Sequence, residues 1–219
     1  MPRLLAAFLS LALLPLGLAL PAAAHPHVWV IYETAVVYEG DKITALRHKW
    51  TFDEMYTTMA IEGLDANKDG VYSREELAEL AKVNMEGLTE FDYFSFAKLG
   101  ETPLKFKVPT EFYLEHKNDA LSLYYTLPLE RPVPASAANF TFSIYDPSFF
   151  ISFEPAKENA FSVVNAPEGC KAATIVSEKE KADLDRLKQA FGTAVTAGDA
   201  NMGTGLSYAQ TVGVSCGKS

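Results

Sequence analysis

Twelve residues in the first half of the chain alternate oxygen-bearing side chains with a spacing that suits a hard cation. Residues 65–76 read DANKDGVYSREE, with Gly70 at the sixth position where the chain must turn sharply. A hard cation such as Ca2+ takes about six to eight oxygen ligands, which alternate side chains of a tightly turned loop can supply. The pattern predicts an EF-hand calcium loop. Its expected ligands are Asp65, Asn67, Asp69, Ser73 and Glu76 through side chains and Val71 through its backbone carbonyl.

Helical spacing on both sides of this loop predicts an EF-hand helix-loop-helix insertion over residues 53–90. EF-hands usually occur in pairs, and this chain contains one such loop. We therefore expect a structural calcium site, with an affinity in the weak range of extracellular modules, about 10⁻⁴ to 10⁻³ M. The alternative is an acidic turn that is merely solvated.

A second group of metal-ligating residues follows an apolar N-terminal stretch. Arg3, an interrupted apolar run and the small residues Ala22–Ala24 predict a secretory signal peptide over residues 1–24, cleaved before His25. The apolar run is short and interrupted by proline and glycine, which disfavours a retained membrane anchor. The mature domain is then residues 25–219, exported to the periplasm.

Cleavage would make His25-Pro26-His27 the mature N-terminus and add a free α-amine to two imidazoles. Nitrogen ligands favour zinc, nickel, cobalt or copper over calcium. Pro26 has no amide proton to lose, so any metal must be held by side chains and the terminal amine. The candidate transition-metal ligands are His25, His27, His48, Asp53 and Asp146.

Several of these residues have an ordinary structural interpretation as well. His48 could be a packed strand residue, Asp53 the N-cap of the first insertion helix, and Asp146 part of an Asp-Pro turn. We expect His116, in a polar HKND turn, to be solvated.

The chain has two cysteines, Cys170 and Cys216, and a formal net charge of −9. In an exported protein such a pair predicts one disulfide, with a two-thiolate metal site as the alternative. The net negative charge favours cations as ligands and argues against nucleic acid as a partner. We expect no lipid anchor.

The remaining elements predict a β-rich scaffold. Short aromatic and β-branched runs separated by turn residues recur over residues 28–52 and 93–154. SEKEKADLDRLKQAF, residues 177–191, has the period of an amphipathic helix. The expected fold class is α+β: one antiparallel β-sandwich-like domain with the EF-hand insertion and a C-terminal amphipathic helix.

These motifs together resemble a known family. HPHVWV, KWTFDEMY, DANKDG, YDPSFF and a late Gly-Cys pair resemble the domain of unknown function 1007 family over nearly the whole mature chain. That family is described as the periplasmic component of an uncharacterised ABC-type transport system, often beside nickel/cobalt-type transporters. The resemblance implies transition-metal handling and an inner-membrane metal transporter as partner. The family commonly has two tyrosines after YDP, whereas this chain has Phe149 and Phe150.

Three functions are compatible with these observations. The first is a non-enzymatic periplasmic calcium-binding protein that also binds a divalent transition metal and serves a transporter. The second is a calcium-stabilised structural or interaction protein, and the third a copper histidine-brace enzyme. Since neither a Gly-x-Ser-x-Gly nor an HExxH motif occurs, we expect no enzymatic activity.

Overall fold

The computed structural model describes residues 26–135, 137, 139–148, 150–175, 186, 189 and 210–216, which form two β-sheets and a small helical region. The first sheet contains β1 (Val28–Glu39), β2 (Lys42–Phe52), β5 (Phe112–Lys117), β6 (Ala120–Pro134), β8 (Ile151–Pro155) and β9 (Phe161–Val164). The second contains β3 (Ser95–Leu99), β4 (Thr102–Leu104), β7 (Phe140–Ile144), β10 (Cys170–Thr174) and β11 (Val212–Cys216). The helices are α1 (Glu54–Ala60), α2 (Ala78–Leu88) and the 3-10 helix η1 (Thr89–Phe94).

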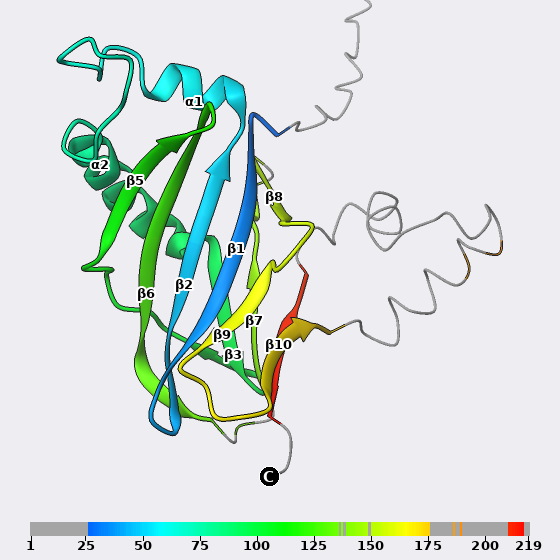
Figure 1. The fold of residues 1–219 in the computed structure, drawn as a ribbon. Coiled ribbons are helices and arrows are strands. Elements are labelled where there is room, and N and C mark those ends of the chain that lie inside the picture. Colours follow the sequence, from blue (N-terminus) through cyan, green and yellow to red (C-terminus); the bar gives the residue numbers. More distant parts are fainter. Residues whose placement is uncertain are drawn as a thin grey trace, which may run out of the picture.

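The first sheet has the order β5-β6-β2-β1-β8, and β9 also pairs with β1 (Figure 1). The hairpin from β1 to β2 turns at Gly40, whose φ of 59° lies in the left-handed region that glycine adopts without strain. Strands β8 and β9 run parallel to β1, whereas every other pair is antiparallel among the described strands. Parallel β8 brings the chain after Asp146 beside the start of β1.

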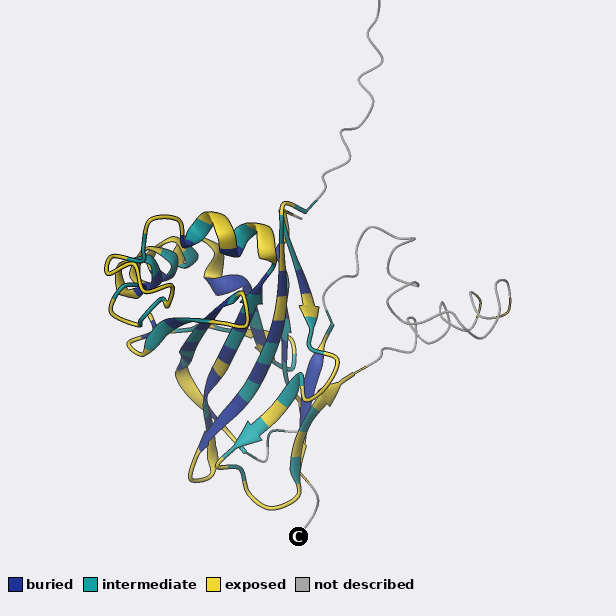
Figure 2. Cartoon of the chain, turned by 45° about the horizontal axis from the view of Figure 1, so that its top comes forward, coloured by how far each residue is buried: buried dark blue, intermediate teal, exposed yellow. Residues whose placement is uncertain are grey.

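The core lies between the two sheets because their strands alternate apolar and polar side chains. On β2, Leu46, His48, Trp50 and Phe52 are buried, whereas the intervening residues are less so. Figure 2 shows this alternation as bands of buried and exposed residues along the long strands. The core therefore includes a histidine as well as large aromatic side chains.

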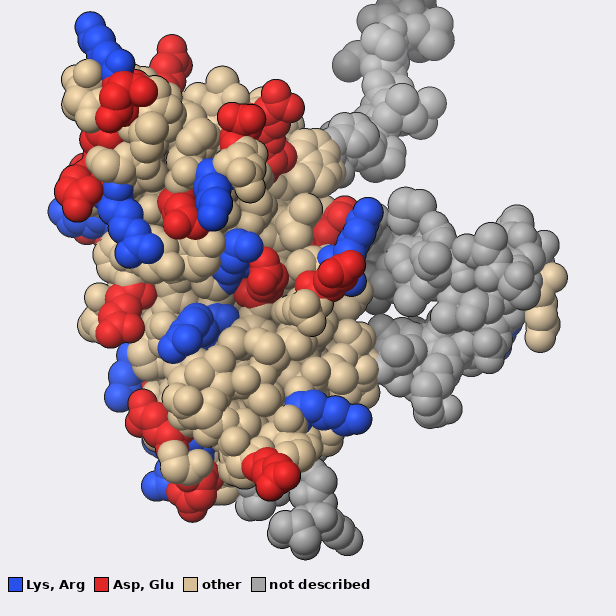
Figure 3. Space-filling model, viewed as in Figure 1, with Lys and Arg blue, Asp and Glu red and all other residues tan. Residues whose placement is uncertain are grey.

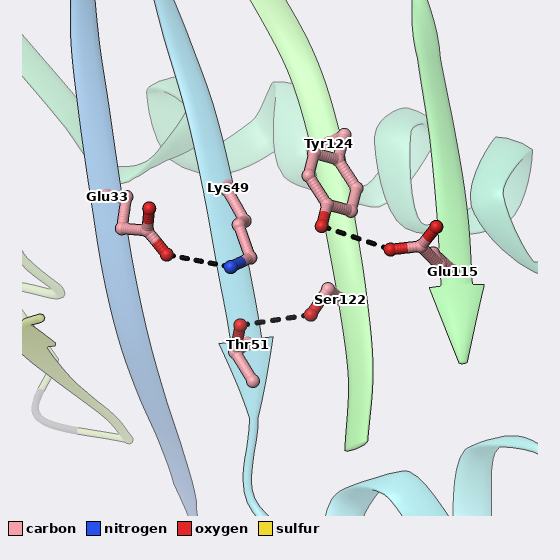
Figure 4. Close-up of polar contacts among 6 residues, drawn as sticks. All are labelled: Glu33, Lys49, Thr51, Glu115, Ser122 and Tyr124. Atoms are coloured by element: carbon pink, nitrogen blue, oxygen red, sulfur yellow. Dashed lines mark hydrogen bonds and ion pairs between the residues drawn. The ribbon is translucent and has the colours of Figure 1, made fainter. Parts of the chain in front are cut away.

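Cross-strand polar contacts tie the outward face of the first sheet together (Figure 4). Lys49 Nζ contacts Glu33 Oε1 at 2.7 Å, and Thr51 Oγ1 lies 2.9 Å from Ser122 Oγ. These pairs join β1 to β2 and β2 to β6, which fixes the register of the strands at the centre of the sheet.

The helices lie at one end of the first sheet. α1 follows β2 directly, and α2 packs against β5 (Figure 1). A hydrogen bond from Tyr56 Oη to Asn84 Oδ1, 3.0 Å long, joins the two helices. Among the described residues, no helix is long and apolar enough to cross a membrane.

The expected α+β fold class is wrong. Strand residues greatly outnumber helical residues, and the two named α-helices, α1 and α2, are short, so the fold is mostly β. The predicted C-terminal amphipathic helix falls on residues 177–191, which lie outside the described residues except for 186 and 189. The prediction of a purely antiparallel sandwich is also wrong, because β8 and β9 run parallel to β1.

The predicted EF-hand helix-loop-helix over residues 53–90 is also wrong. In an EF-hand the two helices flank the twelve-residue loop directly. Here α1 ends at Ala60, where Ile61 and the left-handed Gly63 (φ 78°) break the helical conformation before the loop begins. α2 begins only at Ala78, after a run of turn residues. The segment is two separated short helices with a long connection between them.

Charge is concentrated on this helical segment. Residues 53–92 contain eleven Asp or Glu and three Lys or Arg, so they carry −8 of the chain's formal −9. Figure 3 shows acidic side chains at the end of the molecule where α1 lies. This helical segment therefore attracts cations more strongly than the rest of the chain does.

Candidate metal-binding sites

The connection between the helices contains the 65–76 loop, whose acidic side chains fold back onto the loop's own backbone. Asp65 accepts hydrogen bonds from the amides of Asp69 (3.2 Å) and Gly70 (3.0 Å). Asn67 Oδ1 accepts from the amide of Asp69 at 2.9 Å, and Asp69 Oδ1 accepts from the amide of Val71 at 2.8 Å. Gly70 has a φ of 81°, so the sharp turn predicted at this position forms there.

Glu76 closes the loop from its other end. Its carboxylate accepts from the amide of Ala66 (3.0 Å), the amide of Ser73 (2.9 Å) and the hydroxyl of Ser73 (2.8 Å). The backbone hydrogen bond from Ser73, followed by that from its hydroxyl, lowers the pKa of Glu76 below the ordinary value. As an ionised carboxylate, Glu76 at the end of the loop therefore binds Ala66, the second residue of the loop.

The donor chemistry of the loop suits a hard cation. The six predicted ligand residues supply only oxygen atoms, from three carboxylates, one amide, one hydroxyl and one backbone carbonyl. In the part of the chain that the structure describes, no three His, Cys, Asp or Glu side chains lie close enough together to hold a metal ion. The carboxylates of this loop instead bind backbone N–H groups, and a cation would have to compete with those bonds.

The loop is attached to the edge strand β5 through two aromatic contacts. The ring of Tyr72 meets His116 edge-on at 5.0 Å, and the Arg74 guanidinium lies 3.7 Å above the ring of Tyr113. Tyr113 and His116 are an odd number of positions apart on β5, so their side chains lie on opposite faces of the strand. The loop thus contacts both faces of this edge. His116, expected to be solvated, is half-buried against Tyr72.

The second predicted site lies at the start of β1. His25 falls outside the described residues, whereas His27 is exposed. The His27 amide donates to the Phe150 carbonyl at 2.8 Å, and its ring packs on the Phe150 ring at 4.9 Å. His27 is therefore held against the segment that precedes β8.

Asp53 and Asp146 anchor this same end of the sheet. Asp53 caps α1 by accepting from the amide of Tyr56 (2.9 Å), as predicted for an N-cap, and it also accepts from the amide of Trp29 (2.8 Å). Buried Asp146 accepts four hydrogen bonds, from the amides of Ser148, Phe150 and Ile151 and from the Ser148 hydroxyl. Both carboxylates are thus occupied by hydrogen bonds from backbone amides, and Asp146 also by one from a hydroxyl.

His48 lies far from this group. It pairs with Thr34 across β1 and β2, seven residues along β1 from His27, which corresponds to about 23 Å of strand. Its Nδ1 is 3.0 Å from Thr34 Oγ1, and its Nε2 is 3.5 Å from Ser95 Oγ. Burial lowers the pKa of His48 to about 3, so the imidazole is neutral. Thr34 and Ser95 thus place one hydroxyl near each ring nitrogen of His48 inside the core.

The predicted disulfide between Cys170 and Cys216 is confirmed. The two cysteines face each other across the antiparallel pair β10 and β11. Because β11 pairs with β7 over a short stretch, the covalent bond helps to hold β10 in the second sheet. A disulfide is consistent with an oxidising compartment.

Sequence reasoning missed the partners of these residues. Thr34 and Ser95 contact His48 from other strands. Only the alternation of side chains along each strand, which turns all three residues toward the core, could have suggested these contacts. Tyr72 and Arg74 attach the 65–76 loop to β5, and nothing in the sequence except their aromatic and cationic side chains could have indicated these contacts.

Comparison with known proteins gives the family of the chain. A family model described as "Protein of unknown function (DUF1007)" matches residues 10–216. An uncharacterized protein of Haemophilus influenzae is 22% identical over 208 residues, covering 93% of this chain and 97% of the relative. No solved structure matches. Because the family model matches nearly the entire chain, the protein belongs to the DUF1007 family.

Proposed function

We propose that this protein binds Ca2+ in the 65–76 loop and uses the ion to stabilise the connection between α1 and α2. The observation that supports this most directly is the inward folding of the loop around oxygen atoms spaced as in calcium loops. The ion would neutralise carboxylates in a segment that carries most of the chain's net negative charge.

The types of ligand atom in the loop suit such an ion, which would have to displace the hydrogen bonds that the carboxylates accept from backbone amides. Asp65, Asp69 and Glu76 supply carboxylates, and the Gly70 turn brings the two ends of the loop together. Calcium tolerates irregular coordination at about 2.3–2.6 Å, whereas Mg2+ requires near-ideal octahedral geometry. The proposal therefore predicts a preference for calcium over magnesium.

Stability measurements test this proposal. With a dissociation constant of about 10⁻⁴ to 10⁻³ M, 10 mM Ca2+ should raise the free energy of unfolding by roughly 1.4–2.7 kcal/mol. The variant Glu76→Gln should lose this gain, whereas the matched control Glu79→Gln on α2 should keep it. An equal gain with Mg2+, or a gain retained in Glu76→Gln, would contradict a specific calcium loop.

A second candidate function is transition-metal binding at the mature N-terminus. The observation that favours it is that His27 is exposed and held in place by Phe150, whose amide in turn donates to Asp146. We infer that His25, with its α-amine, and His27 supply the nitrogen ligands. His48 is not included because it is neutral and buried in the core.

Zinc provides the probe for this second site. Protein with His25 as its first residue should bind one Zn2+ at pH 7.5 in calorimetry, because the terminal amine loses its proton near pH 8. A tag left ahead of His25, or the variant His27→Ala, should weaken zinc binding without changing the calcium-dependent gain in stability. Zinc binding that is unchanged in both would contradict this site.

We further propose that the protein acts in the periplasm after cleavage of residues 1–24, as an accessory to an inner-membrane metal transporter. The Cys170–Cys216 disulfide supports export to an oxidising compartment. Mass spectrometry of the exported protein should find His25 at its N-terminus, and retention of residues 1–24 would contradict the proposal.

A further inference from the structure

The core between the sheets contains a group of polar atoms that lack partners among the described residues. They are the hydroxyls of Tyr93 and Tyr125 and the indole N–H of Trp50. All three residues are buried, with exposed fractions of 6%, 2% and 1% respectively. Buried polar groups in proteins are nearly always hydrogen-bonded, to protein or to ordered water. Three such atoms on side chains that pack against one another therefore need an explanation.

These side chains form one cluster around Tyr125. Its ring centroid lies 5.3 Å from that of Trp50, 6.4 Å from that of Tyr93 and 4.8 Å from that of His48. The Tyr125 hydroxyl approaches Ser95 but does not reach hydrogen-bond geometry, and the Ser95 hydroxyl donates instead to the Tyr93 carbonyl at 2.9 Å. Burial raises the pKa of Tyr125 well above its ordinary value, so its phenol keeps its proton.

The chain over this cluster is strained. Asp92, Tyr93 and Phe94 have φ values of 50°, 54° and 47°, which non-glycine residues rarely adopt. This turn places the Tyr93 side chain in the core directly before β3 begins at Ser95. A conformation of this kind persists only where the surroundings hold it, and a hydrogen-bonded group inside the core would do so.

The chemistry of the cluster decides what it can hold. Phenol and serine hydroxyls both donate and accept, the indole N–H donates, and the neutral His48 imidazole can accept. No Lys or Arg is buried in the described ranges, so an anion would have no countercharge there. Asp146 is the only buried Asp or Glu among the described residues, and its four hydrogen bonds go to Ser148, Phe150 and Ile151 rather than to this cluster.

We propose that this aromatic cluster is an internal binding site for ordered water, held by the hydroxyls of Tyr93 and Tyr125 and the indole N–H of Trp50. Water matches the donors and acceptors, carries no charge, and bridges two to four polar groups in such sites. The bound water completes the polar core that begins with Thr34 and His48 on the first sheet.

A crystal structure and a double-mutant cycle test the proposal together. We expect a density peak within about 3.2 Å of two of the three atoms. Tyr93→Phe and Tyr125→Phe should each lower the folding equilibrium constant about three- to tenfold, and the double variant should lose less than the product.

Tyr38 supplies the matched control, because its hydroxyl is also buried without a partner but lies outside the cluster. It is four residues beyond Thr34 on β1, about 13 Å along the strand. Tyr38→Phe should combine with Tyr125→Phe multiplicatively, without coupling. Absence of the density peak would overturn the proposal, as would Tyr93→Phe and Tyr125→Phe variants that are as stable as the parent or more so and combine without coupling.

Discussion

Acid should destabilise this protein through one buried side chain, His48. In the folded state burial lowers the pKa of His48 to about 3, whereas an unfolded histidine titrates near 6.5. Below about pH 6.5 the unfolded chain therefore binds a proton that the folded chain does not. The free energy of unfolding should fall as the pH drops, until the folded His48 itself titrates near pH 3.

The size of the effect follows from these two pKa values. Each pH unit in this window costs about 1.4 kcal/mol, so lowering the pH from 7.5 to 4.5 should remove about 2.7 kcal/mol. That loss is a large fraction of the stability of an ordinary domain. The perturbation that isolates it is His48→Gln, which keeps a polar side chain but cannot titrate.

Urea unfolding followed by tryptophan fluorescence, at several pH values and constant calcium, measures the effect. The His48→Gln variant should lose about 2.7 kcal/mol less than the parent between pH 7.5 and 4.5, whatever its stability at neutral pH. The control His116→Gln, on the edge strand, should follow the parent. Equal losses in parent and His48→Gln would refute the assignment of the acid sensitivity to the core histidine.

Three further results are expected. Asp146→Ala should lower the free energy of unfolding by about 3 kcal/mol, because four hydrogen bonds to a buried carboxylate are lost, as urea unfolding would measure; a change below about 0.5 kcal/mol would contradict that role. Replacing Cys170 and Cys216 by serine should cost on the order of 3–4 kcal/mol from loop entropy, measured by thermal unfolding, and unchanged stability would count against it. Arg74→Ala should speed amide exchange in β5 several-fold, because the contact with Tyr113 is worth about 0.5–1 kcal/mol, and unchanged exchange would show that this contact does not protect the edge.

Much of the scaffold could be predicted from local patterns. Alternation along residues 28–52 predicted β1 and β2, and Asp53 had the sequence of an N-cap. These features are local because strand parity and capping depend on neighbouring residues. The cysteine pairing was predictable because only one pairing of two cysteines exists within the chain.

The remaining features depend on contacts between distant segments. No local pattern shows that β8 and β9 pair in parallel with β1, since that depends on how the chain returns to the sheet. His48 could equally have been a ligand or a core residue, and only its packing beside Tyr125 and Ser95 decides its environment. Helical spacing on both sides of residues 65–76 predicts adjoining helices, yet the left-handed Gly63 ends the helical conformation before the loop.

The most direct test of calcium binding is a titration that counts ions. Protein stripped of metal with EDTA and returned to buffer should bind one Ca2+ per chain, with a dissociation constant of about 10⁻⁴ to 10⁻³ M by equilibrium dialysis. Glu76→Gln should abolish saturable binding, and Glu79→Gln should preserve it. No saturable binding up to about 10 mM, or equal binding in Glu76→Gln, would contradict the account.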